Sequence, residues 1–362
     1  MRGVTIVLTG PGTTEQREYD VPDPAPGGMV LEMLRANVCG SEVHILKGDH
    51  PRIRPGCVLG HEGVGRIARL GAGVTTDSAG EPLQEGDRVV ATYFGECRHC
   101  PECGRGDRHL CRNAYARWAI PADEAPHFAG TFGTHWVLNG DEAVYKVPDA
   151  VSSRAVSSAN CALSQMVHAM ARGDVRRGDT VLVLGAGGLG LCAAALVSAA
   201  GAHAVVAEVT PARLPKALAF GAASTVDLSG APDAAARVAL LREATGGGAD
   251  VVLEVTGVPS AFAEGVQSAR NGGRFLGVGN ISPNRFAELD PGAFTRSGMT
   301  MTAVLRYPTW MLSRAVDFIA STPQLPWDDL VDADFGLDQV DAALAAAADR
   351  SVTRAGILVT GS

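Results

Sequence analysis

The chain has 362 residues, a length that suggests two domains, and its 46% hydrophobic and 19% charged residues exclude a disordered protein. Its formal net charge of −8 argues against a nucleic-acid partner, because such binders normally carry a basic excess. No apolar run reaches the roughly 18 residues that a membrane span needs, and Met1–Gly12 lacks the features of a signal peptide, so we expect a cytoplasmic protein that does not bind a membrane.

The N-terminal part, up to about residue 150, is predicted to form a β-rich domain. Short β-prone runs alternate there with turn signals rich in Gly and Pro. The predicted strands are Thr5–Leu8, Val30–Ala36, Gly63–Leu70, Arg88–Ala91 and Ala143–Val147.

Four cysteines of this region have the spacing of a metal site, C-x2-C-x2-C-x7-C, at Cys97, Cys100, Cys103 and Cys111. In a long chain without a secretion signal, such a cluster indicates a metal and not disulfides. Four thiolates with no open position describe a closed structural Zn²⁺ site. An iron–sulfur cluster is the competing interpretation, although the bacterial ferredoxin ending C-x3-C-P is missing. Cys57 and Cys192 lie in apolar contexts and are expected to be buried small hydrophobes.

From about residue 152 the chain alternates between predicted strands and helices, which indicates a parallel, doubly wound sheet. The predicted elements are the strands Val181–Leu184, Ala204–Ala207, Val251–Val255 and Gly272–Gly279 and the helices Leu189–Ala200 and Ala212–Phe220. The C-terminal part adds the helices Trp310–Ala320 and Leu337–Ala347 and a final strand, Gly356–Thr360.

A glycine-rich turn lies between the first predicted strand and helix of this region. Residues 185–190 fit the pattern G-x-G-x-x-G in the strand–turn–helix context that dinucleotide binding requires. Gly185 is expected to make the tight turn, Gly187 to admit a pyrophosphate, and Gly190 to allow close helix packing. The helix that begins at Gly188 and Leu189 would present its partial positive charge to the phosphates.

The cofactor is predicted to be NAD and not NADP. Glu208 ends the next predicted strand, about 20 residues further on, where a carboxylate binds the ribose hydroxyls and repels a 2′-phosphate. Arg213 complicates this prediction, because an arginine there could tolerate the phosphate.

A second metal site is suggested by Cys39, His61 and Cys161, which come from separate parts of the chain. Two thiolates, one imidazole and an open fourth position describe a catalytic zinc. Taken singly, each of these residues is as often a structural residue as a metal ligand. Together with the dinucleotide pattern, the three point to one arrangement.

With these motifs, the chain resembles the zinc-dependent medium-chain alcohol dehydrogenases over essentially its whole length. The resemblance rests on the segment C-G-S-x-x-H from Cys39, the segment G-H-E-G-x-G from Gly60, the four-cysteine lobe, Cys161 and the glycine pattern. It implies an α/β fold with a GroES-like β-barrel catalytic domain (residues 1–155 and 307–362, with the lobe at about 95–112) and a doubly wound parallel Rossmann NAD-binding domain (residues 156–306). It also implies an active site in the cleft between these domains.

The resemblance implies a role for each matching residue. Cys39, His61 and Cys161 would hold the catalytic zinc, and Glu62 would be a transient extra ligand or an electrostatic tuner. Glu42, at a position where the family usually has Asp, would orient a zinc ligand through a side chain that is one methylene longer.

The proton relay is implied in the same way. Ser41 would take the proton of the alcohol, and His44 would pass it to solvent through the cofactor ribose. The cofactors would be NAD and two zinc ions per chain, one catalytic and one structural.

The substrate is predicted from three segments expected to line the pocket: Ile45–Arg54, Ala114–Trp136 and Arg306–Trp310. An apolar cavity could be bounded by Trp118, Trp136 and Trp310. The nearby arginines would either meet an anionic substrate or be solvated: Arg52, Arg54 and Arg306. The Cys39–His44 motif and the Thr75–Glu85 loop resemble those of bacterial enzymes that act on secondary or cyclic alcohols.

Alternatives to an alcohol dehydrogenase stay open. The chain could be a zinc-bearing NAD-binding protein without dehydrogenase activity, a reductase working mainly from carbonyl to alcohol, or a zinc-free quinone or enoyl reductase. The intact ligand and relay residues argue against the first and the last of these. The partner is expected to be a small alcohol or carbonyl compound, and the resemblance implies a homodimer or homotetramer built through the Rossmann sheet.

Overall fold

The computed structural model describes residues 1–50 and 52–359, and the chain divides into two compact units. The first unit comprises Met1–Ser164, Arg306–Pro323 and Trp327–Ser362, and the second comprises Gln165–Leu305 and Gln324–Pro326. Within the described ranges, no helix has both the length and the apolar character that crossing a membrane would require.

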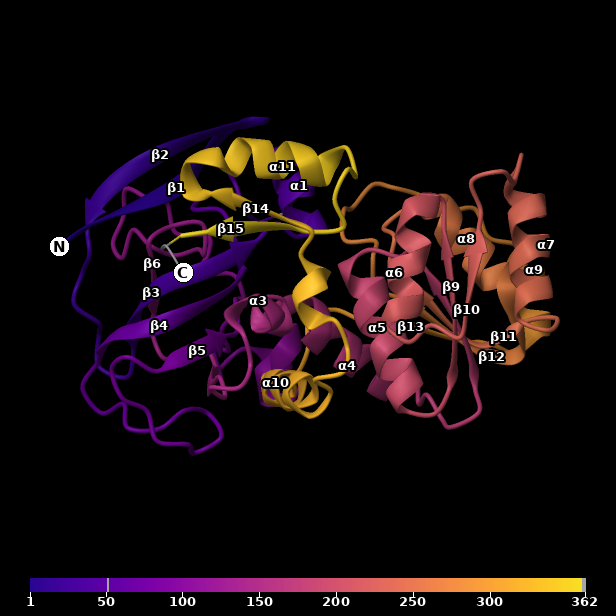
Figure 1. Ribbon diagram of the computed structural model, residues 1–362, viewed down its shortest axis with the longest axis horizontal. Coiled ribbons are helices and arrows are strands. Elements are labelled where there is room, and N and C mark those ends of the chain that lie inside the picture. The colour runs from indigo at the N-terminus through magenta and orange to yellow at the C-terminus, as the bar shows by residue number, and fades with distance from the viewer. Residues whose placement is uncertain (51, 360–362) are drawn as a thin grey trace. The chain divides into compact units, whose positions relative to one another are not determined.

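The first unit is built on a mostly antiparallel sheet with the strand order β14-β15-β3-β4-β5-β7, in which β6 also pairs with β3. Its strands are β3 (Met29–Asn37), β4 (Glu62–Leu70), β5 (Arg88–Ala91), β6 (His135–Leu138), β7 (Val144–Lys146), β14 (Ala333–Gly336) and β15 (Ala355–Leu358). A separate hairpin is formed by β1 (Arg2–Gly10) and β2 (Thr13–Asp20). The yellow C-terminal strands β14 and β15 complete a sheet begun by the indigo strand β3 (Figure 1).

The sheet of the first unit is held by an apolar core on β3, β4, β5 and β6. Its members include Leu31, Met33, Ile67, Val89 and Trp136, each at most 4% exposed. Burying one such aliphatic side chain contributes about 1.5–3 kcal/mol, so this layer stabilises the sheet.

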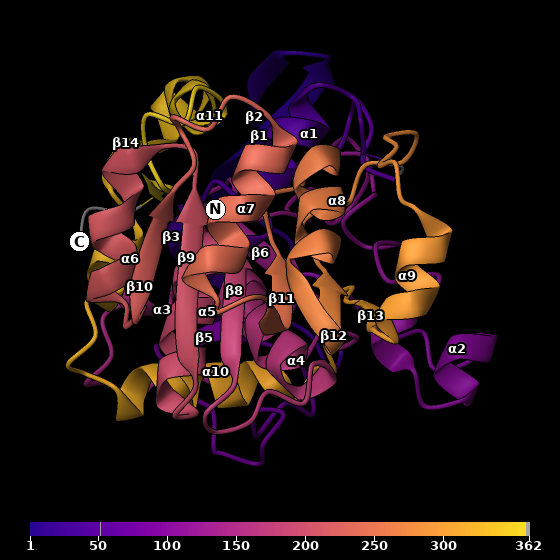
Figure 2. The same cartoon turned by 90° about the vertical axis from the view of Figure 1, so that its right-hand side faces the viewer.

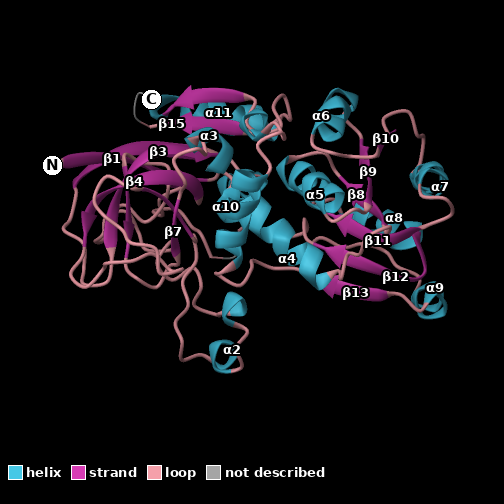
Figure 3. Cartoon of the chain, turned by 60° about the horizontal axis from the view of Figure 1, so that its bottom comes forward, coloured by secondary structure: helices cyan, strands magenta, loops and turns pink. Residues whose placement is uncertain are grey.

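Short helices connect the strands of this unit: α1 (Gly40–Leu46), α2 (Pro101–Gly104), η1 (Arg108–Leu110), α3 (Ser153–Val156), the π-helix η2 (Ala159–Leu163), α10 (Met311–Ser321), η4 (Trp327–Leu330), η5 (Leu337–Gln339) and α11 (Val340–Ala348). Helix α2 lies on an extension set apart from the strands of its unit (Figure 3). This extension contains the four clustered cysteines.

The second unit is a parallel sheet with the order β10-β9-β8-β11-β12-β13, whose strands lie side by side in Figure 2. They are β8 (Thr180–Leu184), β9 (His203–Glu208), β10 (Ser224–Asp227), β11 (Ala249–Glu254), β12 (Ala269–Gly277) and β13 (Thr300–Ala303). The helices are α4 (Ser164–Arg172), which begins at the last residue of the first unit, α5 (Gly188–Ala199), η3 (Pro211–Arg213), α6 (Leu214–Ala219), α7 (Ala234–Ala244), α8 (Pro259–Ser268) and α9 (Pro291–Ser297). Because α5 and α6 lie on one face and α7, α8 and α9 on the other, the sheet is doubly wound, as predicted (Figure 1).

The strand order places the glycine-rich turn at the point where the chain reverses direction across the sheet. From β8 the chain runs outward through β9 and β10, and it returns to the other side of β8 with β11. In open α/β sheets, ligands bind outside the carboxyl ends of the strands at such a switch point.

Several element bounds differ from the predicted ones. The expected helix 212–220 begins as the 3₁₀ turn η3, and β12 begins three residues before the expected strand 272–279. The final strand ends at Leu358, and Thr360 of its predicted range lies outside the described residues. Strand β2 was not predicted, because its alternation is polar on both sides and gives no apolar face to recognise.

Candidate metal and cofactor sites

Four residues of the first unit form a cluster in which all but the half-buried Cys39 are buried: Cys39, His61, Glu62 and Cys161. One ligand atom from each lies within 4.8 Å of the others, and His61 Nε2 is 3.3 Å from Cys161 Sγ. Two sulfurs and an imidazole nitrogen are the donor set that Zn²⁺ prefers. Burying such groups in ionised form without a cation would be costly, so the donor chemistry fits a zinc ion.

The cluster forms at the start of helix α1, at the start of strand β4 and in a π-helical turn. Cys39 is the extended residue that precedes α1, Glu62 is the first residue of β4, and Cys161 lies in the π-helix η2. The β3–β4 register pairs Asn37 with Glu62, which brings the segment after β3 beside the start of β4. The Cys161 thiol donates a hydrogen bond to the Cys39 sulfur. This contact lowers the pKa of Cys39 well below its usual value, and it raises the pKa of Cys161 well above its usual value.

Glu42 holds two of these residues in place. Its Oε1 contacts Nδ1 of His61, and its Oε2 accepts the backbone N–H of Cys39 at 3.0 Å. Burial alone would lower the pKa of His61, but the Glu42 carboxylate and the Cys39 sulfur outweigh it and raise that pKa well above its usual value. The contact expected for Glu42 is therefore present, and the longer side chain also reaches the backbone of a second ligand.

Glu62 is paired on one side only. Its Oε2 accepts from Nη1 of the buried Arg354, while Oε1 has no hydrogen-bond partner within residues 1–50 and 52–359. Burial raises the pKa of Glu62 to about 7, against the opposing effect of the Arg354 charge. A carboxylate with one free oxygen beside three metal donors can serve as an extra ligand or adjust the charge at the site.

The two expected relay residues lie on α1. Ser41 Oγ is buried, and the described part of the chain offers it no hydrogen-bond partner. A buried hydroxyl normally has a partner, so a substrate oxygen is a suitable one. The His44 side chain is 30% exposed, and its Nδ1 lies 3.8 Å from Oδ2 of Asp49.

Aromatic rings surround the imidazole of the cluster. The ring centroids of Tyr93 and Trp118 lie 4.7 Å and 5.2 Å from that of His61. Tyr115 stacks on Tyr93 at 6.3 Å, and His50 lies 6.1 Å from Trp118. The side chains beside His61 are therefore aromatic, and the pocket that Tyr93 and Trp118 line also contains the charged residues Arg117 and Glu142.

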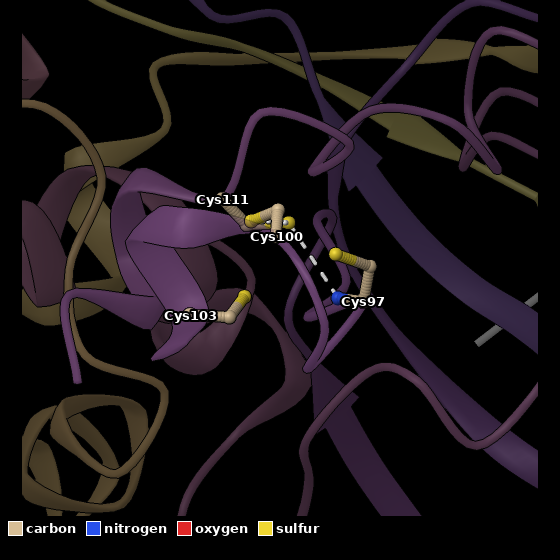
Figure 4. A group of neighbouring side chains, drawn as sticks. All are labelled: Cys97, Cys100, Cys103 and Cys111. Atoms are coloured by element: carbon tan, nitrogen blue, oxygen red, sulfur yellow. Dashed lines mark hydrogen bonds between the residues drawn. The ribbon is translucent and has the colours of Figure 1, made fainter. Parts of the chain in front are cut away.

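The four cysteines of the lobe converge on one another (Figure 4). A ligand atom of each lies within 4.8 Å of the others, and the Cys100 and Cys111 sulfurs are 3.9 Å apart. The backbone N–H of His99 donates to the Cys97 sulfur and lowers the pKa of Cys97 to about 6. A thiol that ionises this readily is a good metal ligand. Glu102 accepts two hydrogen bonds from Arg112, at 3.0 and 2.9 Å, which tie α2 to the segment after Cys111.

The glycine turn of the second unit has the geometry that its pattern requires. Gly185 has a φ of +110°, and a Cβ at Gly190 would lie 1.8 Å from the Gly185 carbonyl oxygen. Apart from Gly187 and its two chain neighbours, no atom of the described residues lies within 4 Å of a Cβ added there, so a ligand can approach the backbone. Gly188 and Leu189 begin α5 as expected.

Glu208 is bound to this turn. Its Oε2 accepts the N–H of Ala186 at 2.8 Å, and its Oε1 accepts those of Val209 and Thr210 at 2.8 and 3.0 Å. The carboxylate therefore lies at the end of β9 against the glycine turn. Arg213 is the last residue of the short turn η3 that follows.

Comparison with known proteins agrees with this geometry. Residues 25–149 match the family model of the alcohol dehydrogenase GroES-like domain, and residues 188–321 match that of the zinc-binding dehydrogenases. A 5-exo-hydroxycamphor dehydrogenase of Pseudomonas putida is 32% identical over 343 residues, which cover 93% of each chain. The chain belongs to the zinc-dependent medium-chain alcohol dehydrogenase family.

Other relatives support the same assignment. An L-threonine 3-dehydrogenase of Idiomarina loihiensis is 31% identical over 326 residues, covering 86% of this chain and 89% of the relative. The crystal structure of an alcohol dehydrogenase from Thermotoga maritima superposes with a TM-score of 0.91 at 27% identity and covers 99% of both chains. The protein is thus a zinc-dependent oxidoreductase that acts on an alcohol/carbonyl pair and uses a nicotinamide cofactor.

The prediction made for Arg306 is wrong. Arg306 is neither solvated nor free to meet an anionic substrate, since it is 5% exposed. Its guanidinium donates to the carbonyl oxygens of His109 at 2.6 Å and Cys111 at 3.3 Å, and it lies 4.9 Å from the ring centroid of Tyr115. Arg306 therefore fastens the lobe. Arg52 and Arg54, in contrast, are exposed.

The expectations for the two isolated cysteines are confirmed, and those for the three tryptophans are confirmed in part. Cys57 and Cys192 are buried, as predicted. Of the three tryptophans expected to bound a cavity, Trp118 and Trp136 line one pocket together with Tyr93, whereas Trp310 is 55% exposed and is not among the residues that line it. Pro51, within the expected lining segment Ile45–Arg54, lies outside the described residues.

Sequence reasoning missed three residues that the structure brings to the site. Arg354 pairs with Glu62, Asn160 contacts the backbone of His61, and the ring centroid of Tyr93 lies 4.7 Å from that of His61. Asn160 directly precedes Cys161, which was the only local signal. The other two come from distant segments, which a single sequence does not pair with the motifs.

Proposed function

We propose that this protein is an NAD-dependent dehydrogenase of secondary or cyclic apolar alcohols, with Cys39, His61 and Cys161 as the ligands of a catalytic zinc. The observation that carries the proposal is the buried convergence of two sulfurs and an imidazole next to the aromatic rings of Tyr93 and Trp118. A metal site with three protein ligands keeps a position open for substrate.

The chain's own residues would move the proton. When bound, zinc supplies a Lewis acid that favours loss of the alcohol proton, and NAD supplies the hydride acceptor. Ser41 Oγ would accept the alcohol proton, and the partly exposed His44 would pass it to solvent. Glu42 would keep the His61 ring oriented through Nδ1, so that Nε2 faces the metal.

The choice of NAD is assigned to Glu208. A carboxylate held by the Ala186 N–H of the glycine turn and by the N–H groups of Val209 and Thr210 would accept ribose hydroxyls and would repel a 2′-phosphate. A second, structural zinc is assigned to the lobe, where four cysteine sulfurs leave no open position.

The substrate class follows from the side chains around His61. Tyr93 and Trp118 carry no charge, and they suit an apolar ring better than the ammonium and carboxylate groups of an amino acid. The relative named as acting on 5-exo-hydroxycamphor supports a bulky cyclic alcohol, whereas the relatives named L-threonine 3-dehydrogenase provide the competing candidate.

A homodimer or homotetramer would form through β13. This strand is at the edge of the parallel sheet, and Thr300, Met301 and Ala303 are exposed. An open edge with uncharged side chains can pair with a second copy. Sedimentation velocity of wild type and Met301→Asp tests this, and a monomeric wild type would contradict it.

The function is tested by following NADH absorbance with bicyclic and monocyclic secondary alcohols, primary alcohols and L-threonine. We expect the highest kcat/KM for a cyclic secondary alcohol and no turnover by Cys161→Ala. A higher kcat/KM for L-threonine would refute the substrate class, and full activity of Cys161→Ala would refute the site.

A further inference from the structure

Asn160 is a buried amide that precedes Cys161, and it makes more contacts than are needed to hold Cys161 in place. It is 0% exposed and lies in the π-helix η2, all of whose residues are buried. π-Helical turns are rare and occur frequently at functional sites. A buried amide must satisfy its hydrogen bonds, so its partners indicate what it holds in place.

Two of these partners belong to strands that separate at this point. Strands β4 and β5 are paired at two positions, Gly65 opposite Val89 and Arg66 opposite Arg88. Two residues beyond Gly65 in the same register, Gly63 would lie opposite Ala91. There the Asn160 amide lies between the strands: Nδ2 donates to the Ala91 carbonyl at 2.9 Å, and Oδ1 accepts from the Gly63 N–H at 3.4 Å. The side chain thus substitutes for a direct ladder bond.

The other contacts reach both metal-ligand segments. Asn160 Nδ2 also donates to the His61 carbonyl at 2.9 Å, so both amide hydrogens are used. The Asn160 backbone carbonyl accepts from the hydroxyl of Tyr307, which is 0% exposed and packs on Phe94 with ring centroids 5.2 Å apart. One residue therefore joins the backbone of His61 to the turn that carries Cys161.

We propose that Asn160 is a positioning residue that sets the separation of His61 and Cys161 for the catalytic metal, an inference that rests on the proposed metal role of these ligands. Without the amide, Gly63 and Ala91 can close their ladder directly, which moves the start of β4, and His61 with it, away from its present place beside η2. Metal affinity then falls although every ligand is intact.

The test compares Asn160→Leu with a matched control, Thr92→Val. Thr92 is also 0% exposed and follows Ala91, and its hydroxyl donates to the Phe94 carbonyl at 2.9 Å and accepts the Ala143 N–H at 3.0 Å. The control therefore loses two buried hydrogen bonds close to the site without touching a ligand segment. Each protein is equilibrated with zinc buffered by chelator, and its zinc per chain is counted.

Alkylation of the thiols by iodoacetamide, read by peptide mass spectrometry, shows which site has released its ion. We expect the zinc dissociation constant at Cys39 and Cys161 to rise about 10- to 100-fold in Asn160→Leu, the range seen when groups that orient metal ligands are removed. The lobe thiols should stay protected, and Thr92→Val should behave as wild type.

Wild-type protection of Cys39 and Cys161 in Asn160→Leu would overturn the inference while leaving the proposed function intact. If that variant does not fold, Tyr307→Phe decides by the same readout: a several-fold weaker site supports the inference, and an unchanged one refutes it. A wild type whose Cys39 and Cys161 are alkylated in saturating zinc would overturn the proposed function, and this inference with it.

Discussion

Replacing Glu208 with glutamine separates a structural from a cofactor-selecting role of this carboxylate. Glu208 is 7% exposed, and its two oxygens accept three backbone N–H groups. If the amide oxygen keeps the bonds from Val209 and Thr210, the new NH₂ group faces the N–H of Ala186. A buried N–H left unpaired costs about 1–3 kcal/mol, so the free energy of unfolding should fall by this amount.

Cofactor binding should change by a separate amount. Hydrogen bonds to a charged acceptor are worth about 1 kcal/mol more than those to a neutral one, so two ribose hydroxyls lose about 2 kcal/mol. At about 1.36 kcal/mol per tenfold, kcat/KM for NAD should fall roughly 30-fold. Loss of the negative charge also removes repulsion of a 2′-phosphate, so the preference for NAD over NADP should fall further.

The assay is kcat/KM with both cofactors, together with chemical unfolding. Asp227→Asn is the matched control, since Asp227 pairs with Glu208 in the β9–β10 register, is exposed, and contacts Ser229 and not the glycine turn. It makes the same charge change one strand away and should leave the cofactor ratio within about twofold, which is under 0.5 kcal/mol. An unchanged cofactor ratio in Glu208→Gln, with lowered stability, would refute the selecting role.

Three further predictions concern the metal sites. Glu42→Gln should weaken zinc binding beside His61 about 10- to 100-fold, because it removes the charge facing Nδ1; unchanged affinity in a chelator titration would contradict this. Arg306→Met should lower the free energy of unfolding by about 1–3 kcal/mol, because two carbonyl oxygens of the lobe lose their donor; a wild-type urea midpoint would show that these contacts contribute nothing. Hydrogen bonds from Arg112 hold the pKa of Glu102 at about 2 against a usual 4.5. A depressed carboxyl pKa stabilises the folded chain above pH 4.5, and this contribution is lost as the pH falls toward 2. Wild type should therefore be more stable than Glu102→Gln near neutrality and equal to it in strong acid; a pH-independent difference would refute the linkage.

Motifs that act through neighbouring residues could be read from the sequence. The cysteine spacing brings four sulfurs together within one loop, and the glycine pattern needs only the strand and helix on either side of it, so tertiary context adds little to either. Both are found where predicted, the first on the lobe and the second at the switch point of the parallel sheet.

Contacts made by side chains far apart in the chain could not be read in this way. An arginine is normally expected at the surface, so its residue type gives no sign that Arg306 is buried. Its backbone has a φ of +50°, and its side chain binds carbonyl oxygens of the lobe that lie 195 or more residues earlier in the chain. The bridge that Asn160 makes between β4 and β5 depends on where that ladder stops. Neither the end of a ladder nor an inward turn leaves a periodic signal in a single sequence.

Zinc stoichiometry of the wild type and of Cys161→Ala tests the central claim most directly, with Cys192→Ala as the control for loss of a buried thiol away from both clusters. We predict two zinc ions per chain in the wild type and in Cys192→Ala, and one in Cys161→Ala, which should stay folded, bind NAD and lack turnover. Two ions per chain in Cys161→Ala, or turnover that survives the loss of one, would contradict the assignment of Cys39, His61 and Cys161 as the catalytic metal site.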